Sequence, residues 1–141
     1  MRTMRISSSA GSLVAALFLL LLPGAFAESD FSAFWKNFKS AVIANDKARV
    51  VQMTKFPLSI YGSEIKTQAE FLRRYGKIFS GEANAAACFA KAEPQKDSET
   101  MYSVYCPFKK TPNDLENAPI RFVFESTKAG WKFTALDNIN E

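Results

Sequence analysis

The chain has 141 residues with two Cys and no His, and its 18 basic and 14 acidic residues give a net charge of +4. This length allows one domain, and an apolar content of 48% is too high for a disordered chain. Without His, the sequence excludes a His-based catalytic triad, a His general base and a His metal ligand.

Residues 1–27 are predicted to be a signal peptide. Arg2 and Arg5 form a basic start, residues 13–22 are all apolar, and Ala25-Phe26-Ala27 has the small-x-small pattern of a cleavage site. The apolar run is shorter than the about 20 residues that span a bilayer, which disfavours a retained membrane anchor. We therefore expect cleavage after Ala27 and no stable membrane insertion afterwards.

Residues 28–141 are then predicted to be a single exported domain, periplasmic or secreted. Its net charge falls to +2, because both of the charges that cleavage removes are Arg. With no dense basic tract and no nucleic-acid motif, we expect no nucleic-acid partner. The sequence also lacks Gly-rich phosphate loops, nucleophile elbows and metal-ligand clusters, so we expect neither a cofactor nor a metal.

Two helices are predicted first. Asp30, or Ser29 before it, can cap a helix that starts at Phe31 and continues to about residue 44. Asp46 can cap a short second helix, which ends at Phe56-Pro57 because the residue before Pro resists helical angles. The first helix has an aromatic face made of Phe31, Phe34, Trp35, Phe38 and Val42.

A short strand is expected at residues 58–61, followed by a third helix. Thr67-Gln68-Ala69-Glu70 is a capping-box pattern, and Gly81 ends the helix that it opens. After Gly81 the apolar period changes to two, which predicts strands at 86–93, 101–108, 120–125 and 131–136. Residues 109–119 form a polar loop between the second and third of these strands.

The two Cys predict a hairpin register. If Cys88 faces Cys106, the turn centres on Asp97, inside the polar stretch 94–100. Because export permits oxidation, we predict a cross-strand disulfide between Cys88 and Cys106. A thiol nucleophile and a metal pair are the alternatives, and the lack of His and of an adjacent acid disfavours both.

The last hairpin is predicted to place Glu125 opposite Lys132. The same register places Phe124 opposite Phe133 and Phe122 opposite Ala135 on a strongly aromatic face. A sheet with one aromatic face and one mixed face is typical of a sheet that helices cover on one side.

Five motifs, taken with the order of elements, carry a resemblance to a known family: Phe31-x-x-Phe34-Trp35-x-x-Phe38, Phe56-Pro57-Leu58, Thr67-x-x-Glu70-Phe71-Leu72, Ile120-x-Phe122-x-Phe124 and Gly130-Trp131-x-Phe133. With them the chain resembles the nuclear-transport-factor-2-like superfamily, which includes ketosteroid-isomerase-like and polyketide-cyclase-like domains. The resemblance is strongest to small exported bacterial members of unassigned function, and it covers nearly all of residues 30–138. It implies an α+β fold in which N-terminal helices pack on a curved, mostly antiparallel sheet, with a cone shape and an apolar pocket at the open end.

A ligand pocket is expected between the first helix, the third helix and the aromatic sheet face. Its candidate lining, taken from the periodic pattern, is Phe34, Phe38, Tyr61, Tyr75, Phe122, Phe124 and Phe133, with Asp137 as a pocket carboxylate. The alternative for most of these side chains is packed core, which leaves the pocket largely filled.

Two functions follow from this pattern. The first is an exported, non-catalytic binding protein of the cell envelope that holds an apolar small molecule or a protein partner. The second is a small acid–base enzyme of the isomerase or dehydratase type, which uses Asp137 with a pocket Tyr. No motif places a strong general base, so binding is preferred. A homodimer through the sheet face, and a protein contact through that face or the 109–119 loop, are further expectations.

Overall fold

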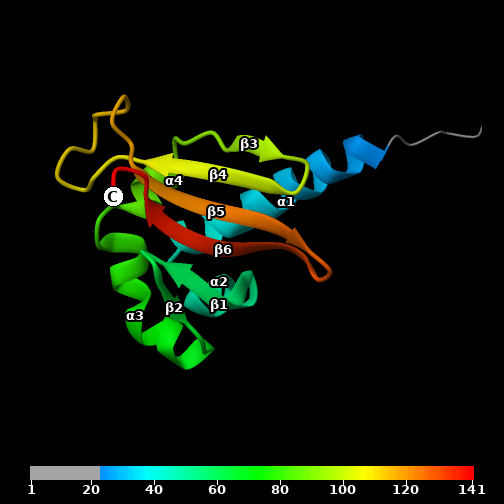
Figure 1. Ribbon diagram of the computed structural model, residues 1–141, viewed down its shortest axis with the longest axis horizontal. Helices are drawn as coiled ribbons and strands as arrows, with labels where there is room; N and C mark the ends of the chain where they lie inside the picture. Colours follow the sequence, from blue (N-terminus) through cyan, green and yellow to red (C-terminus); the bar gives the residue numbers. More distant parts are fainter. Residues whose placement is uncertain (1–22) are drawn as a thin grey trace, which may run out of the picture.

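The computed structural model describes residues 23–141, which form four helices and six strands (Figure 1). Residues 1–22, and with them most of the predicted signal peptide, lie outside the described residues. In the described part, no helix is both long and apolar enough to cross a membrane. The elements in chain order are α1 (Pro23–Ile43), α2 (Lys47–Gln52), β1 (Thr54–Ile60), β2 (Ser63–Ile65), α3 (Gln68–Ser80), α4 (Ala85–Phe89), β3 (Gln95–Ser98), β4 (Met101–Cys106), β5 (Ile120–Thr127) and β6 (Gly130–Asn138).

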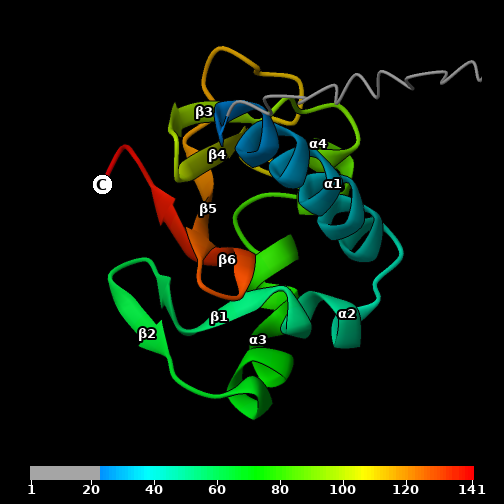
Figure 2. The same ribbon diagram turned by 90° about the vertical axis from the view of Figure 1, so that its right-hand side faces the viewer.

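The strands form one mixed sheet in the order β2-β1-β6-β5-β4-β3. β1 and β6 pair in parallel, and the other neighbouring strands pair antiparallel. The sheet curves around the helices, which lie together on its inner side (Figure 2). The predicted fold class, helices packed on a curved and mostly antiparallel sheet, is confirmed.

Local sequence signals explain where the helices begin. The Asp46 carboxylate accepts a hydrogen bond from the Arg49 N–H at the start of α2, as predicted. The Thr67 hydroxyl accepts a hydrogen bond from the Glu70 N–H at the start of α3, and the Glu70 carboxylate accepts one from the Lys66 N–H. Capping at these residues satisfies N–H groups that have no partner within the helix.

The core is built mainly from aromatic rings. Phe38 of α1 lies 5.0 Å from Phe124 and 5.6 Å from Phe133, measured between ring centroids. Phe122 lies 4.9 Å from Phe89 of α4 in an edge-to-face arrangement. All five rings are fully buried, so the helices and the inner sheet face meet without solvent between them.

Several predicted boundaries are wrong. The first helix begins at Pro23 and not at Phe31, because Pro suits the first helical position and the Ala-containing segment after it continues the helix. β1 begins at Thr54, so the second helix ends before Phe56-Pro57. Residues 85–89 form the helix α4 in place of a strand, and β3 is limited to residues 95–98.

The register of the last hairpin is confirmed next to its turn. Glu125 pairs with Lys132, and Phe124 pairs with Phe133. A bulge between Val123 and Phe124 then shifts the register by one residue, so Phe122 pairs with Leu136 and not with Ala135. The bulge adds one residue to β6 and keeps both Phe122 and Leu136 on the buried face.

Candidate functional site

The structure brings the predicted aromatic lining together as packed core. Phe38, Phe122, Phe124 and Phe133 are fully buried and in ring contact with one another, with centroid separations of 5.0–5.9 Å for the pairs that they form. Phe34 is partly buried at the edge of this cluster. The three clefts described below have none of these five rings in their walls.

The two predicted pocket tyrosines lie in different surroundings. Tyr75 of α3 is 4% exposed, and its hydroxyl is buried without a hydrogen-bond partner among the described residues. Burial, with a smaller contribution from the Asp46 charge, raises the pKa of Tyr75 to about 12. Tyr61 lies half-exposed in the turn between β1 and β2, with a φ of 46°. Burial raises its pKa to about 12 as well, helped by the charge of Glu82.

Asp137 forms an ion pair on the other face of the sheet from the aromatic core. Its two carboxylate oxygens accept hydrogen bonds from Arg121 Nε at 3.0 Å and Arg121 Nη2 at 2.6 Å. Hydrogen bonding to Asp137 raises the pKa of Arg121. Because neighbouring residues in a strand point to opposite faces, both side chains point away from the buried Phe122. Asp137 is therefore not part of an aromatic pocket.

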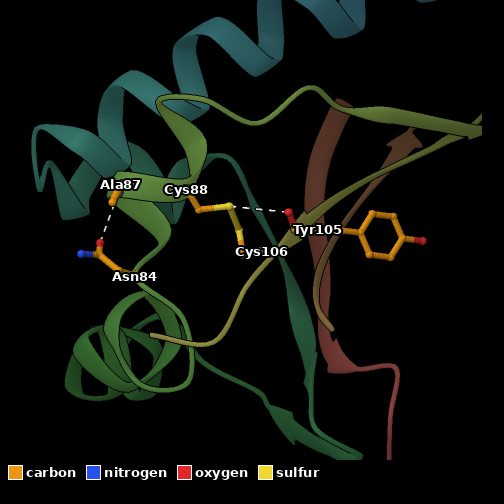
Figure 3. Close-up of a disulfide and its surroundings, with 5 residues drawn as sticks. All are labelled: Asn84, Ala87, Cys88, Tyr105 and Cys106. Carbon is orange, nitrogen blue, oxygen red and sulfur yellow. Dashed lines mark hydrogen bonds between the residues drawn. A yellow bond between two sulfur atoms is a disulfide. The ribbon is translucent and has the colours of Figure 1, made fainter. Parts of the chain in front are cut away.

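The predicted Cys88–Cys106 disulfide is present, but its setting differs from the prediction. It joins α4 to the last residue of β4, with an S–S distance of 2.01 Å and a Cα–Cα distance of 5.7 Å (Figure 3). The cross-strand register is wrong, because β3 pairs with β4 through Gln95 and Ser103. Cys88 Sγ lies 3.6 Å from the carbonyl oxygen of Tyr105; this sulfur carries no proton, so the contact is not a conventional hydrogen bond.

α4 owes its position to two local features besides the disulfide. The Asn84 side chain accepts a hydrogen bond from the Ala87 N–H at 3.2 Å and so caps the helix (Figure 3). At the other end of the helix, the buried Phe89 ring packs edge-to-face on Trp35 of α1 at 5.0 Å. One side of α4 is thereby fixed to the core, and Ala87 remains exposed on the other side.

An open cleft lies between α4 and the loop that joins β4 to β5. Its volume is about 310 Å³, at the lower end of the range of about 300–1,000 Å³ typical of ligand sites. The disulfide forms part of its wall through Cys88. The remaining apolar lining residues are Ala87, Ala92, Pro107, Phe108, Pro112 and Leu115. We call this space the disulfide cleft.

Polar groups surround the apolar surface of the disulfide cleft. Asn84 and Asn113 line it, and its charged lining residues are Lys91 and Lys109. The Lys109 N–H donates to the Glu82 carbonyl at 2.7 Å, and the Lys109 ammonium donates to the carbonyl of Ser80 at 2.9 Å. These two bonds fix Lys109 against the end of α3.

Two further clefts continue from this one in a row. The first has a volume of about 520 Å³ and shares Phe108 and Lys109 with the disulfide cleft. The second has a volume of about 280 Å³, shares Glu82 with the first, and includes Tyr61 and Arg74. Tyr61 is thus the one predicted lining residue that borders a described cleft.

The sequence prediction missed the residues of the disulfide cleft. One signal was available: Leu115 is a large apolar residue inside an otherwise polar loop, and it is 77% exposed in the structure. The strand prediction for residues 86–93 concealed the other wall, which α4 provides. Among the described residues, no group of three or more Cys, Asp or Glu side chains could hold a metal ion.

Comparisons with known proteins report similarity of fold. No protein-family model matches the chain, and no curated protein matches it. An NTF-2-like protein of unknown function from Shewanella oneidensis MR-1 is 15% identical over 78% of this chain and 96% of its own, with a TM-score of 0.43. A protein from Shewanella frigidimarina NCIMB 400, named a "putative ketosteroid isomerase", is 15% identical over 79% of this chain and 95% of its own, with a TM-score of 0.45.

The α+β arrangement described above, with helices packed on a curved and mostly antiparallel sheet, is the fold class that the resemblance in the sequence predicts. The helices cover one face of a curved, unclosed mixed sheet, and most of the aromatic residues that carry the resemblance are buried between these two layers.

Proposed function

We propose that the protein is an exported, non-catalytic binding protein of the cell envelope, and that it holds an apolar small molecule in the disulfide cleft. The observation that supports this most is the contrast between two apolar regions. The interior of the fold is filled with aromatic rings in contact, whereas the disulfide cleft is open and has apolar walls. Affinity for an apolar molecule needs such walls and no reactive group.

The acid–base alternative has less support. Its carboxylate, Asp137, is held by two hydrogen bonds from Arg121 on the outer sheet face. Its tyrosine candidates are Tyr75 and Tyr61; burial raises the pKa of each to about 12, so both hydroxyls stay protonated at neutral pH. A general base works best with a pKa near the working pH, which neither tyrosine has, and Asp137 lines none of the three described clefts.

A neutral apolar dye tests the binding proposal. The full chain, exported by a diderm host and purified from its periplasm, is titrated with N-phenyl-1-naphthylamine, whose fluorescence rises in apolar surroundings. Leu115→Asn removes an apolar wall of the disulfide cleft, and we expect affinity to fall about fivefold to tenfold. Because Leu115 is 77% exposed, the free energy of unfolding should hardly change.

Two control variants separate the cleft from other regions. Leu72→Asn changes a 43% exposed Leu on α3 that does not line the cleft, and it should leave dye affinity unchanged. Asp137→Asn should also leave dye binding unchanged. Equal affinity in wild type and Leu115→Asn would contradict the cleft as the site, and loss of a measured turnover in Asp137→Asn with folding intact would favour the enzyme.

A further inference from the structure

We propose that the natural ligand of the disulfide cleft is an amphipathic anion: an apolar body that carries one acidic group, which Lys91 and Lys109 bind. The inference rests on the proposed function, because it names the class of ligand for the same site. It goes beyond that function by assigning a charge to the ligand and two residues that recognise this charge.

The charge of the lining is the first step. Lys91 and Lys109 are the charged residues among those that line the cleft, and both are cationic. The acidic residues of the neighbouring loop, Asp114 and Glu116, are exposed and do not line it. The Asp114 carboxylate instead accepts a hydrogen bond from the Asn117 N–H at 3.2 Å. Glu82 borders the adjoining cleft. A ligand in the disulfide cleft therefore faces two positive charges and no negative charge from the lining.

The second step is that Lys109 is held in place before a ligand arrives. Its backbone N–H donates to the Glu82 carbonyl at 2.7 Å, and its ammonium donates to the Ser80 carbonyl at 2.9 Å. An ammonium has three donors, so two remain for a ligand. Holding the side chain in one position reduces the entropy lost on binding. Lys91 has no ion pair among the described residues.

The third step is the combination of charge with an apolar wall. Phe108, Leu115 and the disulfide sulfur of Cys88 border the same space of about 310 Å³. A purely hydrophilic anion leaves this surface in contact with water, and a purely apolar molecule leaves both ammonium charges without a negative charge from the ligand. An apolar body with a single acidic group uses both features.

The experiment compares two competitors that differ in charge. Decanoate and decanamide have the same chain, but decanoate is negatively charged at pH 7. Each displaces N-phenyl-1-naphthylamine from the full chain purified from the periplasm. At low ionic strength we expect decanoate to displace the dye at about a tenfold lower concentration than decanamide, and we expect 0.5 M NaCl to shrink this preference.

Variants assign the preference to the two lysines. In Lys91→Gln/Lys109→Gln, decanoate should lose its advantage while decanamide displaces the dye as before. Lys91→Arg/Lys109→Arg keeps both charges and should keep the preference, which separates a lost charge from a disturbed fold. Lys128→Gln, in the exposed turn between β5 and β6, removes one charge elsewhere and should change nothing.

The outcomes distinguish this inference from the proposed function. If the dye and decanamide bind but decanoate binds no more tightly, or if the double Gln variant keeps the preference, the anionic ligand is wrong and the apolar site stands. If neither the dye nor decanamide binds, the proposed function fails, and the anionic ligand fails with it.

Discussion

The disulfide between Cys88 and Cys106 should contribute a large share of the stability of the domain. The two residues are 18 positions apart, and the chain-entropy model gives about 3 kcal/mol for closing a loop of this size in the unfolded chain. Cys106 is fully buried, so replacing it by Ala also leaves a small cavity. We expect Cys88→Ala/Cys106→Ala to lower the free energy of unfolding by about 3–4 kcal/mol in total.

Equilibrium unfolding in urea measures this loss. Trp35 and Trp131 are both buried, so their fluorescence reports the loss of the core, and far-UV circular dichroism follows the helices in the same samples. The m-value should rise, because the unfolded chain without the bridge is less compact. Wild type reduced with dithiothreitol should behave as the double variant does.

A matched variant separates the bridge from the helix that it holds. Asn84→Ala removes the cap of α4 and leaves the disulfide intact, and we expect it to cost about 1 kcal/mol. A double Cys variant that loses less than the cap variant would refute the reasoning, because it would show that the bridge does not constrain the unfolded chain. Dye affinity of the cleft should fall in the double Cys variant, since Cys88 forms part of the cleft wall.

Three further predictions concern the core, one buried hydroxyl and the N-terminus. Phe122→Ala should destabilise the fold by about 3–5 kcal/mol in urea while leaving dye affinity unchanged, because its ring contacts Phe89 and not the cleft; a loss below 1 kcal/mol would show an open pocket there. Tyr75→Phe should raise stability by about 1 kcal/mol, since it removes a buried hydroxyl without a partner. Because the pKa of Tyr75 is raised from 10.0 to about 12, the free energy of unfolding of wild type should fall as the pH rises from about 10 towards 12. The variant lacks this ionisation, so an alkaline titration of unfolding should show a smaller loss in it. N-terminal sequencing of the periplasmic protein should begin at Glu28, and an intact chain recovered from membranes would contradict export with cleavage.

Features set by neighbouring residues could be predicted from the sequence. The side chains of Thr67 and Asp46 each accept a hydrogen bond from the N–H of the residue three positions later and so cap a helix. A short window of sequence therefore contains the whole signal. The pairing of Glu125 with Lys132 is equally local, because a tight turn fixes it. The prediction failed at the bulge beside Val123, where the register depends on which side chains the core can bury.

The Ala-rich segment that forms α4 shows a different limit of prediction from sequence. Residues 86–90 are Ala-Ala-Cys-Phe-Ala, a short apolar run that fits a strand as well as a helix, so periodicity did not decide between them. Asn84 and the strong helix preference of Ala favour α4. The cysteine pair was predicted correctly because the chain has only two Cys, although the elements that carry them were not.

The open or filled state of the interior could not be predicted. Periodicity identifies the face of a helix or strand that is buried, but it does not give the space that remains between two such faces. Phe38 and Phe124 approach to 5.0 Å because the curvature of the sheet brings the strands towards α1. The disulfide cleft has walls from α4 and from an irregular loop, and neither has a repeating pattern that points to a cleft.

The central position of the last strand determines when this chain can fold. β6 lies between β1 and β5, and it alone connects the β1–β2 hairpin to the β3–β5 strands within the sheet. During synthesis the N-terminal residues are made first. The growing chain therefore has two separate pieces of sheet until residues 130–138 have been added. Without that strand, Phe133 and Leu136 are missing from the core. We expect the chain to stay loosely structured until residues 130–138 are present, and a chain in that state can still be moved across a membrane unfolded.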